Sequence, residues 1–426
     1  MLTPADLEVV ERDPALPGLA LVLDHDALAD RLRAVRPELG LVSARATYVR
    51  YKPGTSCLVG YRLELADGEV LAFAKAYRRG DAAKATKARS KGGTAVAAVG
   101  DLVMVAHVAG DRDLPAAGGL ERAGGRHRRL LRRVLPDAPQ CWDAVPRCLR
   151  YKPERRWVGV VEHEGEPVAL VKAYRRDDLV RAHAGLRFAR GISPATPRLL
   201  GVSRRVAALA SSWLPGETLS ELLARPGGAV PTLEVAGEAL AALHAGPPSG
   251  LPVATAEDDA GALHSAAEHL SAVAPRLGAV AVALSKSLGS RLVTGAPEAG
   301  MARHGDFSPD QVVQGDHGVA LLDFDNAEFG DPAADLGQFV ASLWAAHLVS
   351  TAPGPPAVSA VADFLAGYEA GGGVAIPGRV ADHAAAALVR LAVEPFRVRA
   401  PDWPARTEAL LERAAHLARP TFSSPF

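Results

Sequence analysis

The chain has 426 residues, and its 48 basic and 48 acidic side chains cancel to a formal net charge of zero. A chain of this length can bury ample apolar surface in two or three lobes. The balanced charge provides no field that would attract nucleic acid or an acidic membrane surface, so neither partner is expected. The three cysteines are odd in number and have no C-x-x-C spacing, which indicates neither a disulfide framework nor a zinc site.

The N-terminal region predicts a soluble, cytoplasmic protein. It has no basic segment followed by an apolar one, and no run in the chain reaches the roughly 18 to 20 apolar residues of a membrane helix. We expect a monomer or a homodimer with a small-molecule substrate. Residues Leu19–Leu23 predict a short strand, and Asp24 with Asp26 predicts the start of a helix.

An internal repeat occupies the next part of the chain. Residues 50–79 and 150–176 both open with R-Y-K-P and close with K-A-Y-R-R. Alternating apolar residues flank a turn in each copy, so each predicts a meander of antiparallel strands. Residues 100–110 also resemble residues 205–216, which extends the repeat to a later strand. The sequence therefore indicates one strand unit that is present twice.

A basic run lies between the two copies. Residues 121–133 contain six arginines and His127, and this spacing predicts the solvated face of a helix. A nucleic-acid surface is not favoured, because aromatic residues are not interleaved with the basic ones and the total charge is balanced.

The C-terminal half is predicted to be helical after two more strands at residues 195–201 and 206–210. Pro215 and Gly216 then stop the strand and let the chain turn. Apolar stripes and capping residues predict the helices that follow. These helices span residues 218–224, 256–272, 276–288, 333–349, 358–370, 381–393 and 403–419, with a further one that begins at the N-cap Thr232 and ends at His244.

The strongest functional signal lies between Arg303 and Asp335. His304, Asp306 and Gln311 have the spacing H-x-D-x-x-x-x-(N/Q), and Asp323 follows a short apolar run twelve residues later. Two short strands joined by a turn at residues 315–318 would bring these side chains to one end of a hairpin.

This pattern suits phosphoryl transfer, which needs one carboxylate to deprotonate the acceptor hydroxyl and side-chain oxygens to hold Mg²⁺. Asp306 fits the first role, and Gln311 with Asp323 fits the second. Taken singly, Asp325, Asp331 and Asp335 fit turn or cap roles equally well.

The H-G-D opening, the D-F-D block and the G-D-P-x-x-D-L-G run resemble the aminoglycoside phosphotransferase and choline kinase-like superfamily. The H-G-D-x-x-x-x-Q-V version looks most similar to the maltokinase and actinobacterial glucosamine kinase branch. The usual metal-binding Asn is Gln311 here, whose amide oxygen can still ligate Mg²⁺.

The resemblance implies an α+β, protein-kinase-like fold with two lobes: an antiparallel-sheet N-lobe and a helical C-lobe. An extra N-terminal cap unit would repeat the N-lobe meander. The expected boundaries are residues 1–145 for the cap, 146–212 for the nucleotide-binding N-lobe and 213–426 for the catalytic C-lobe.

The resemblance also implies ATP and Mg²⁺ as cofactors, with ATP in a cleft between the second meander and the helical lobe. Lys172 would pair with the phosphates, and the loop from Lys152 to Arg156 would cover them. Lys75 would be a relic or a scaffold residue. The residues expected along the adenine ring are Ser212, Trp213 and Leu214.

One feature departs from the kinase pattern. A Glu on the next helix usually holds the phosphate lysine, but residues 177–191 contain no Glu. Asp177, Asp178 and His183 are the polar residues that remain as partners, and otherwise a ligand alone would hold Lys172.

The acceptor is expected on Asp306 and on a polar cluster near the C-terminus. Carboxylates and Arg bind sugar hydroxyls, and an aromatic face packs beneath the ring. A polar helix end that breaks at Pro395 would explain the same cluster without a ligand. The cluster consists of Glu394, Arg397, Asp402 and Trp403.

Three functions are compared on this basis. The favoured one is a phosphotransferase with an alcohol acceptor, a sugar or amino sugar of carbohydrate metabolism, in which Asp306 is the base and His304 braces the loop. An aminoglycoside antibiotic phosphotransferase is the alternative, but polycationic acceptors usually meet a strongly acidic pocket. A weakly active ATP-binding regulatory protein is the third, because Lys172 lacks a Glu partner and one lobe is redundant.

Overall fold

The structure is a computed structural model. The residues that it describes are 1–92, 96–100, 102–121, 123–192, 194–225, 233–247, 250–316, 318–349 and 357–419. The chain divides into two compact units. Unit 1 holds Met1–Leu179, Leu200–Trp213 and Glu394–Pro404, and unit 2 holds Val180–Leu199, Leu214–Val393 and Ala405–Phe426.

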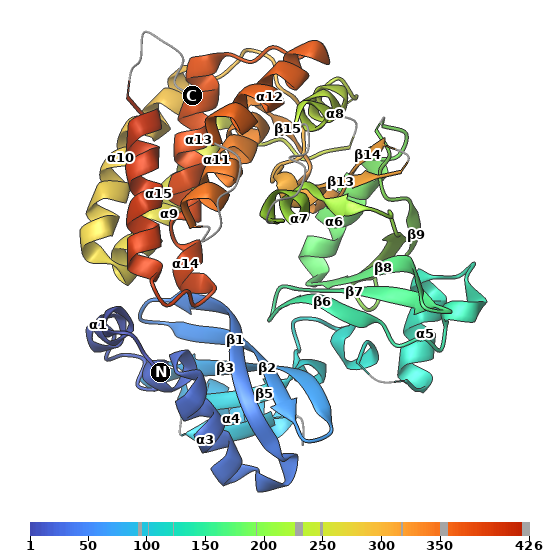
Figure 1. Ribbon diagram of the computed structural model, residues 1–426. Coiled ribbons are helices and arrows are strands. Elements are labelled where there is room, and N and C mark those ends of the chain that lie inside the picture. Colours follow the sequence, from blue (N-terminus) through green and yellow to red (C-terminus); the bar gives the residue numbers. More distant parts are fainter. Residues whose placement is uncertain are drawn as a thin grey trace. The chain divides into compact units, whose positions relative to one another are not determined.

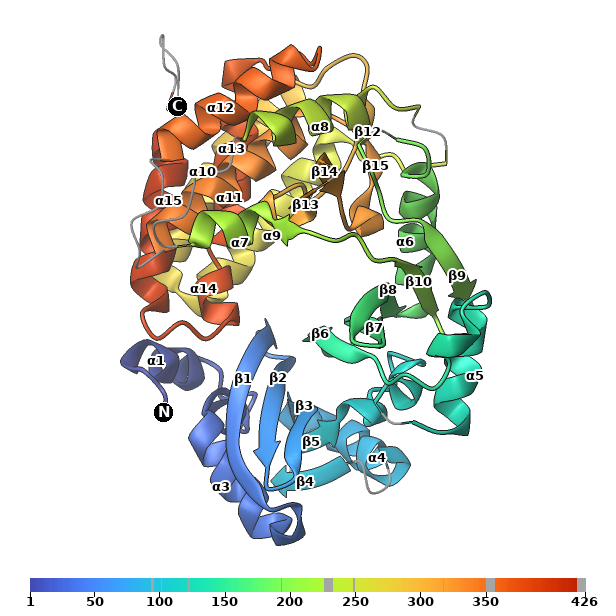
Figure 2. The same ribbon diagram turned by 45° about the vertical axis from the view of Figure 1, so that its right-hand side comes forward.

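Unit 1 contains two five-stranded sheets with the same topology, in the orders β1-β2-β3-β5-β4 and β6-β7-β8-β10-β9 (Figure 1, Figure 2). The predicted duplication of the strand unit is therefore confirmed, including the later strand, since β5 and β10 take equivalent places. The strands are β1 Leu41–Lys52, β2 Ser56–Leu65, β3 Gly68–Tyr77, β4 Val96–Gly100, β5 Val103–His107, β6 Arg147–Lys152, β7 Arg156–His163, β8 Glu166–Tyr174, β9 Leu199–Ser203 and β10 Ala208–Ser212.

Each R-Y-K-P turn is anchored on a buried aspartate from an earlier segment. In the first copy, Asp13 accepts the Tyr51 hydroxyl at 2.7 Å and the backbone N–H of Gly54 at 2.8 Å. In the second copy, Asp111 accepts the Tyr151 hydroxyl at 2.9 Å and the backbone N–H of the equivalent turn residue at 2.8 Å. Both aspartates open a D-x-x-L-P sequence. The duplicated unit therefore begins well before its first strand.

One short element of unit 1 differs from the prediction. Leu19–Leu23 is the helix α2 and not a strand, and it buries Leu19, Val22 and Leu23 at helical spacing. Five consecutive apolar residues are compatible with the repeat of a helix and with that of a strand, so the sequence alone could not distinguish a helix from a strand here. The predicted helix start after it is confirmed, because the Asp24 side chain accepts the first free N–H groups of α3.

The basic run forms the helix α5, as predicted. Its apolar face buries His127, Leu130, Leu131 and Val134, and its described arginines are exposed. The helices of unit 1 are α1 Pro4–Arg12, α2 Leu19–Leu23, α3 His25–Val35, α4 Ala82–Gly92, α5 Gly125–Val134 and α14 Glu394–Arg397; α6 Arg176–Phe188 runs from unit 1 into unit 2.

Unit 2 is mainly helical, with two small antiparallel sheets of order β11-β13-β14 and β12-β15. No helix in the described ranges is both long and apolar enough to cross a membrane. The elements are β11 Glu217–Thr218, α7 Leu219–Ala224, α8 Glu234–His244, α9 Ala256–Val273, α10 Pro275–Thr294, β12 Met301–Arg303, β13 Val312–Gly315, β14 Gly318–Leu321, β15 Glu328–Gly330, α11 Ala333–Val349, α12 Ala357–Ala370, α13 Pro377–Leu391 and α15 Trp403–Leu417.

The predicted helices of this unit are present, with differences at their ends. α13 begins four residues before the predicted start at 381 because Pro377 occupies its first turn, where the missing N–H costs no hydrogen bond. α10 continues beyond the predicted end at 288 to Thr294. The predicted N-cap Thr232 lies outside the described residues.

Helices α8 and α12 approach so closely that two glycines are needed at their crossing. A Cβ on Gly237 would lie 2.1 Å from the Phe364 carbonyl oxygen, and one on Gly367 would lie 2.0 Å from the Glu234 carbonyl oxygen. Each of these distances is far inside van der Waals contact with backbone atoms. The crossing therefore tolerates no side chain at either position.

This crossing gives the first prediction. Gly237→Ala is expected to lower the free energy of unfolding by about 2 kcal/mol or more, because the helices must separate to admit the methyl group. The control is Gly261→Ala in α9, where a Cβ meets nothing within 4 Å. That substitution should raise stability by about 0.5 to 1 kcal/mol. Denaturant unfolding measures both, and equal effects would contradict the close packing.

Candidate active site

The predicted hairpin is present as β13 and β14. Val312 pairs with Leu321, and the Gln311 carbonyl oxygen accepts the backbone N–H of Leu322 at 2.8 Å. Gln311 and Asp323 therefore leave the hairpin at the same end. Asp323 has a left-handed backbone with φ of 58°, which Asp tolerates better than most residues and which turns the chain sharply after the strand.

The loop that carries His304 and Asp306 packs directly against the loop after the hairpin. Gly305 has φ of +87°, and a Cβ there would lie 2.2 Å from the Asn326 carbonyl oxygen. Only glycine fits this combination of backbone angle and close approach. The two loops are thus held in contact next to Asp306.

Both carboxylate oxygens of Asp306 accept hydrogen bonds. Nδ1 of His304 lies 3.0 Å from Oδ1 of Asp306, and the Asn326 amide donates to Oδ2 at 2.8 Å. The Asp306 side chain is nevertheless 35% exposed, whereas His304 is fully buried. A carboxylate fixed at both oxygens and open to solvent can receive a proton from a ligand hydroxyl in one defined direction.

The His304 ring is charged in this setting. Its Nε2 lies 2.7 Å from the Leu322 carbonyl oxygen, so both ring nitrogens face acceptors. Burial alone would lower the pKa of His304, but the hydrogen bond and charge of Asp306, the charge of Asp335 and the Leu322 carbonyl outweigh it and raise the pKa to about 9. A protonated His304 donates from both ring nitrogens and so joins Asp306 to the strand end at Leu322; its part in the reaction stays a prediction.

Asp335 holds the backbone of the same loop. Its carboxylate accepts the N–H of His304 at 2.5 Å and the N–H of Gly305 at 2.9 Å. It is 1% exposed, and His244, at the end of α8, pairs with it at 3.2 Å. Burial acts against the charge, but the bond and charge of His244 lower the pKa of Asp335 overall. The sequence left the role of Asp335 open, and the structure makes it the anchor of this loop.

The loop is also fixed in the hydrophobic core. Phe307 is fully buried and stacks on Phe339 of α11 with ring centroids 5.2 Å apart, and Phe339 stacks on Phe364 of α12 at 4.0 Å. The His304 ring packs against Phe324 at 5.0 Å. Asp306 therefore projects from a segment whose neighbours on both sides are immobilised by packing.

Two further ion-pair groups surround the loop. Buried Arg303 contacts Asp259 at 2.9 Å and Glu328 at 2.7 Å. Asp331 accepts from Nε of Arg379 at 2.7 Å, and Nε2 of His383 lies 3.0 Å from the same carboxylate oxygen. Despite burial, the hydrogen bond and charge of His383, together with Arg379, hold the pKa of Asp331 well below its usual range. Asp331 is thus a structural residue.

The side-chain oxygens of Gln311 and Asp323 suit a Mg²⁺ ion that is also bound by the phosphates of a ligand. Within the described ranges, no group of three or more His, Cys, Asp or Glu side chains could hold a metal. An amide and a carboxylate oxygen supply two ligands, and Mg²⁺ commonly takes one or two carboxylates together with substrate phosphates. The donor set therefore suits a metal–nucleotide complex better than a free ion. Its metal role stays a prediction.

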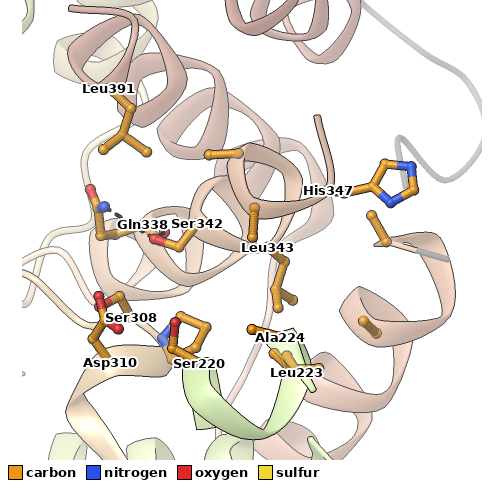
Figure 3. Close-up of a pocket in the computed structure, with 15 residues that line it drawn as sticks. Ser220, Leu223, Ala224, Ser308, Asp310, Gln338, Ser342, Leu343, His347 and Leu391 are labelled. Atoms are coloured by element: carbon orange, nitrogen blue, oxygen red, sulfur yellow. Dashed lines mark hydrogen bonds between the residues drawn. The ribbon is translucent and has the colours of Figure 1, made fainter. Parts of the chain in front are cut away.

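A cavity of about 390 Å³ lies next to this loop in unit 2. Ser308 and Asp310, just after Asp306, face Gln338 and Ser342 of α11 across it (Figure 3). Pro309 and apolar side chains from α7, α11, α12 and α13 complete the lining. Among the described residues that line it, Asp310 is the one carboxylate, and the other polar members are Ser220, Ser308, Gln338, Ser342 and His347.

The predicted nucleotide residues lie at the places that the repeat implies. Lys172 is in β8, opposite Val158 and Leu209, and is 7% exposed. It also interacts with another group of the chain, and its contact with phosphates stays a prediction. Lys152 and Arg156 pair across the β6–β7 turn. Burial, followed by repulsion from neighbouring arginines, lowers the pKa of Lys152 to about 8.

The predicted adenine residues lie at the end of one strand. Ser212 ends β10, and the backbone N–H of Trp213 donates to the Val168 carbonyl oxygen at 3.3 Å. Leu214 belongs to unit 2. Their contact with a base stays a prediction.

The predicted acceptor cluster is part of unit 1. Arg397 pairs with Glu394 at 2.6 Å within α14. Trp403 is 2% exposed, packs edge-on against Phe396, and donates its indole N–H to Asp6 at 3.2 Å. Trp403 is therefore a packing residue in this structure. An acceptor role for Glu394, Arg397 and Asp402 stays a prediction.

Sequence reasoning missed Asn326 and the cavity. Asn326 follows the D-F-D block directly, and its amide is the second group that fixes Asp306. The motif D-F-D-N was visible, but nothing in the sequence showed that the fourth residue turns back toward Asp306. The cavity joins elements that are far apart in the chain, so spacing could not reveal it.

Part of the chain matches a known protein family. Residues 142–374 match the family model APH, described as the phosphotransferase enzyme family. A search among curated protein sequences finds no match.

Solved structures with similarity to the chain include three phosphotransferases or kinases. A choline/ethanolamine kinase family protein from Mesorhizobium loti is 16% identical over 69% of this chain and 94% of that one, with a TM-score of 0.47. The GDP complex of aminoglycoside 2'-phosphotransferase-IIIa is 18% identical over 68% and 97%, with a TM-score of 0.48. Aminoglycoside phosphotransferase APH(3'')-Id from Streptomyces rimosus, with ADP and streptomycin, is 16% identical over 66% and 97%, with a TM-score of 0.44.

The second prediction concerns His304. Its ring should remain protonated from about pH 6 to about pH 8 in a ¹⁵N NMR titration, and the midpoint should fall by about one unit or more in Asp306→Asn. Since the folded pKa exceeds the ordinary value of 6.5, the stabilisation is fully present below pH 6.5 and is lost as pH rises through about 9. A midpoint near 6.5 in the unaltered protein would contradict the charged brace.

Proposed function

Because the chain belongs to the phosphotransferase enzyme family, we propose that it is an ATP- and Mg²⁺-dependent kinase for a hydroxyl of a sugar or amino sugar. The observation that carries the proposal is the Asp306 carboxylate, which is held at both oxygens by His304 and Asn326 and is still 35% exposed. This is the geometry of a positioned acceptor of a hydroxyl proton.

In the proposed reaction, Asp306 orients the acceptor hydroxyl and takes its proton as the oxygen attacks the γ-phosphorus of ATP. The new oxygen–phosphorus bond forms in line with the bond that breaks to release ADP. His304 keeps the carboxylate in place, and Asn326 fixes its other oxygen. Because little covalent chemistry is required, this fixed orientation is the main contribution of these residues.

Gln311 and Asp323 are the proposed metal ligands. Mg²⁺, when bound there, would offset the negative charge of the phosphates. Their common exit from one end of the β13–β14 hairpin supports the assignment. The amide of Gln311 contributes a neutral oxygen, so the pair carries a single negative charge, which suits a site completed by phosphate oxygens.

The nucleotide residues are proposed from the second copy of the strand unit. Lys172 would pair with the phosphates, Lys152 and Arg156 would flank the loop over them, and the end of β10 would meet the adenine. The buried position of Lys172 in the central strand β8 supports a specific role for it, because a lysine is almost never buried unless it is paired. The proposed adenine residues are Ser212, Trp213 and Leu214.

The acceptor is proposed to bind in the cavity beside Ser308 and Asp310. Serine hydroxyls and the Gln338 amide suit the hydroxyl groups of a sugar, and Asp310, the one carboxylate among the described lining residues, suits one amine. A polycationic antibiotic would require several acids. Glu394, Arg397 and Asp402 remain a second proposed contact for the acceptor.

The third prediction tests both the reaction and the acceptor site. ADP release should be robust with one or a few of glucosamine, maltose, glucose and related sugars. Ser342→Trp, which fills the cavity, should raise the acceptor KM by about tenfold or more and leave the ATP KM within about twofold. The control is Ser287→Trp, at an exposed position of α10 that does not line the cavity.

Three outcomes would contradict the proposal in different ways. Activity with kanamycin-type acceptors alone would show that the substrate is an aminoglycoside antibiotic and not a sugar. ADP release with none of the acceptors would favour a regulatory ATP-binding protein. An unchanged acceptor KM in the Ser342→Trp variant would show that the acceptor does not bind in the cavity. The cluster of Glu394, Arg397 and Asp402 would then be the remaining proposed site.

A further inference from the structure

The turn between β6 and β7 contains a residue in an unfavourable backbone conformation. Glu154 has φ of 56°, in the left-handed region. The equivalent residue of the first copy is Gly54, with φ of 64°, for which this conformation has no steric cost. A residue with a Cβ loses about 1 kcal/mol or more there. A glutamate at this position therefore needs a compensating interaction.

The Glu154 side chain forms two ion pairs with the first copy of the strand unit. Nζ of Lys75 in β3 lies 2.6 Å from Oε1, and Arg50 in β1 contacts Oε2. The three side chains are only 15 to 24% exposed, so solvent screens the pairs less than it would at the surface. These pairs supply the compensation that the strained backbone requires.

The two residues before Glu154 contact the same sheet. Nζ of Lys152 lies 5.2 Å from the centre of the Tyr48 ring in a cation–π arrangement. Pro153 packs over Gly60 of β2, where an added Cβ would lie 3.2 Å from the proline ring. Three consecutive residues of the turn, 152 to 154, therefore contact the first sheet. Around Gly54, by contrast, an added Cβ meets nothing within 4 Å.

Lys75 is the counterpart of Lys172, since each opens the K-A-Y-R-R sequence at the end of the third strand of its copy. In the second copy this lysine is the proposed phosphate partner. In the first copy the same position binds a carboxylate of the second copy. The lysine at this position of the first copy therefore pairs with the Glu154 carboxylate of the same chain.

We infer that the first strand unit positions the phosphate loop of the second through Glu154, with Lys75 and Arg50 as positioning residues. The inference rests on the proposed function, because the loop from Lys152 to Arg156 is assigned to ATP there. A loop held on one sheet keeps the backbone and charges that face the phosphates in a single arrangement before the nucleotide arrives, which lowers the ordering cost of binding.

The fourth prediction measures ATP affinity and loop exchange in three variants. Lys75→Met should weaken ATP binding by about tenfold in calorimetry and change kcat by less than about threefold, while Lys75→Arg should stay close to the unaltered protein. Glu154→Gly removes the ion pairs and also relieves the backbone, so it should keep the thermal stability and still weaken ATP binding. Hydrogen exchange of the amides at residues 152–156 should rise in both weakened variants.

The matched control is Arg62→Met, which breaks the Arg62–Glu69 pair on the same sheet. It should change neither ATP affinity nor exchange at residues 152–156. If the unaltered protein binds no ATP, the proposed function fails, and the exchange data still decide whether the first sheet holds the loop. If it binds ATP and Lys75→Met and Glu154→Gly bind it equally well, the inference fails.

Discussion

The site depends on one buried carboxylate, Asp335, which accepts the backbone N–H groups of both His304 and Gly305. An unpaired N–H in this interior would cost about 1 to 3 kcal/mol, and the carboxylate satisfies two of them while remaining paired with His244. The loop is then held in one conformation. The hydrogen bond between the His304 ring and Asp306 fixes the orientation of the Asp306 carboxylate in turn. The positions of the proposed base and of the hairpin end both follow from this anchor.

Duplication explains much of unit 1, and divergence between the copies explains the rest. Both copies keep the sheet order and the aspartate that holds the R-Y-K-P turn. They differ at the residue after the proline, which is Gly54 in one copy and Glu154 in the other. That single difference allows the second turn to pair with the lysine of the first copy. The lysine expected to be a relic or a scaffold residue is thus engaged with the other copy.

The sequence predicted features that depend on local spacing. The hairpin after Gln311, the helix Ala333–Val349 and the two meanders were all visible as patterns of apolar and turn residues. It could not predict contacts between distant residues: Lys75 and Glu154 are 79 positions apart, and the pairing of Glu154 has no local signature. Short apolar runs such as Leu19–Leu23 are ambiguous in period, and the aromatic face expected of Trp403 was hidden by burial that only the folded chain shows.

The most direct test of the central claim is the single-turnover rate of Asp306→Asn with ATP and the preferred acceptor. Asparagine has nearly the same shape but cannot take the hydroxyl proton. The account predicts ATP affinity within about twofold of the unaltered protein and a rate lower by about 100-fold or more. A rate close to that of the unaltered protein would remove Asp306 from the chemistry and contradict the account.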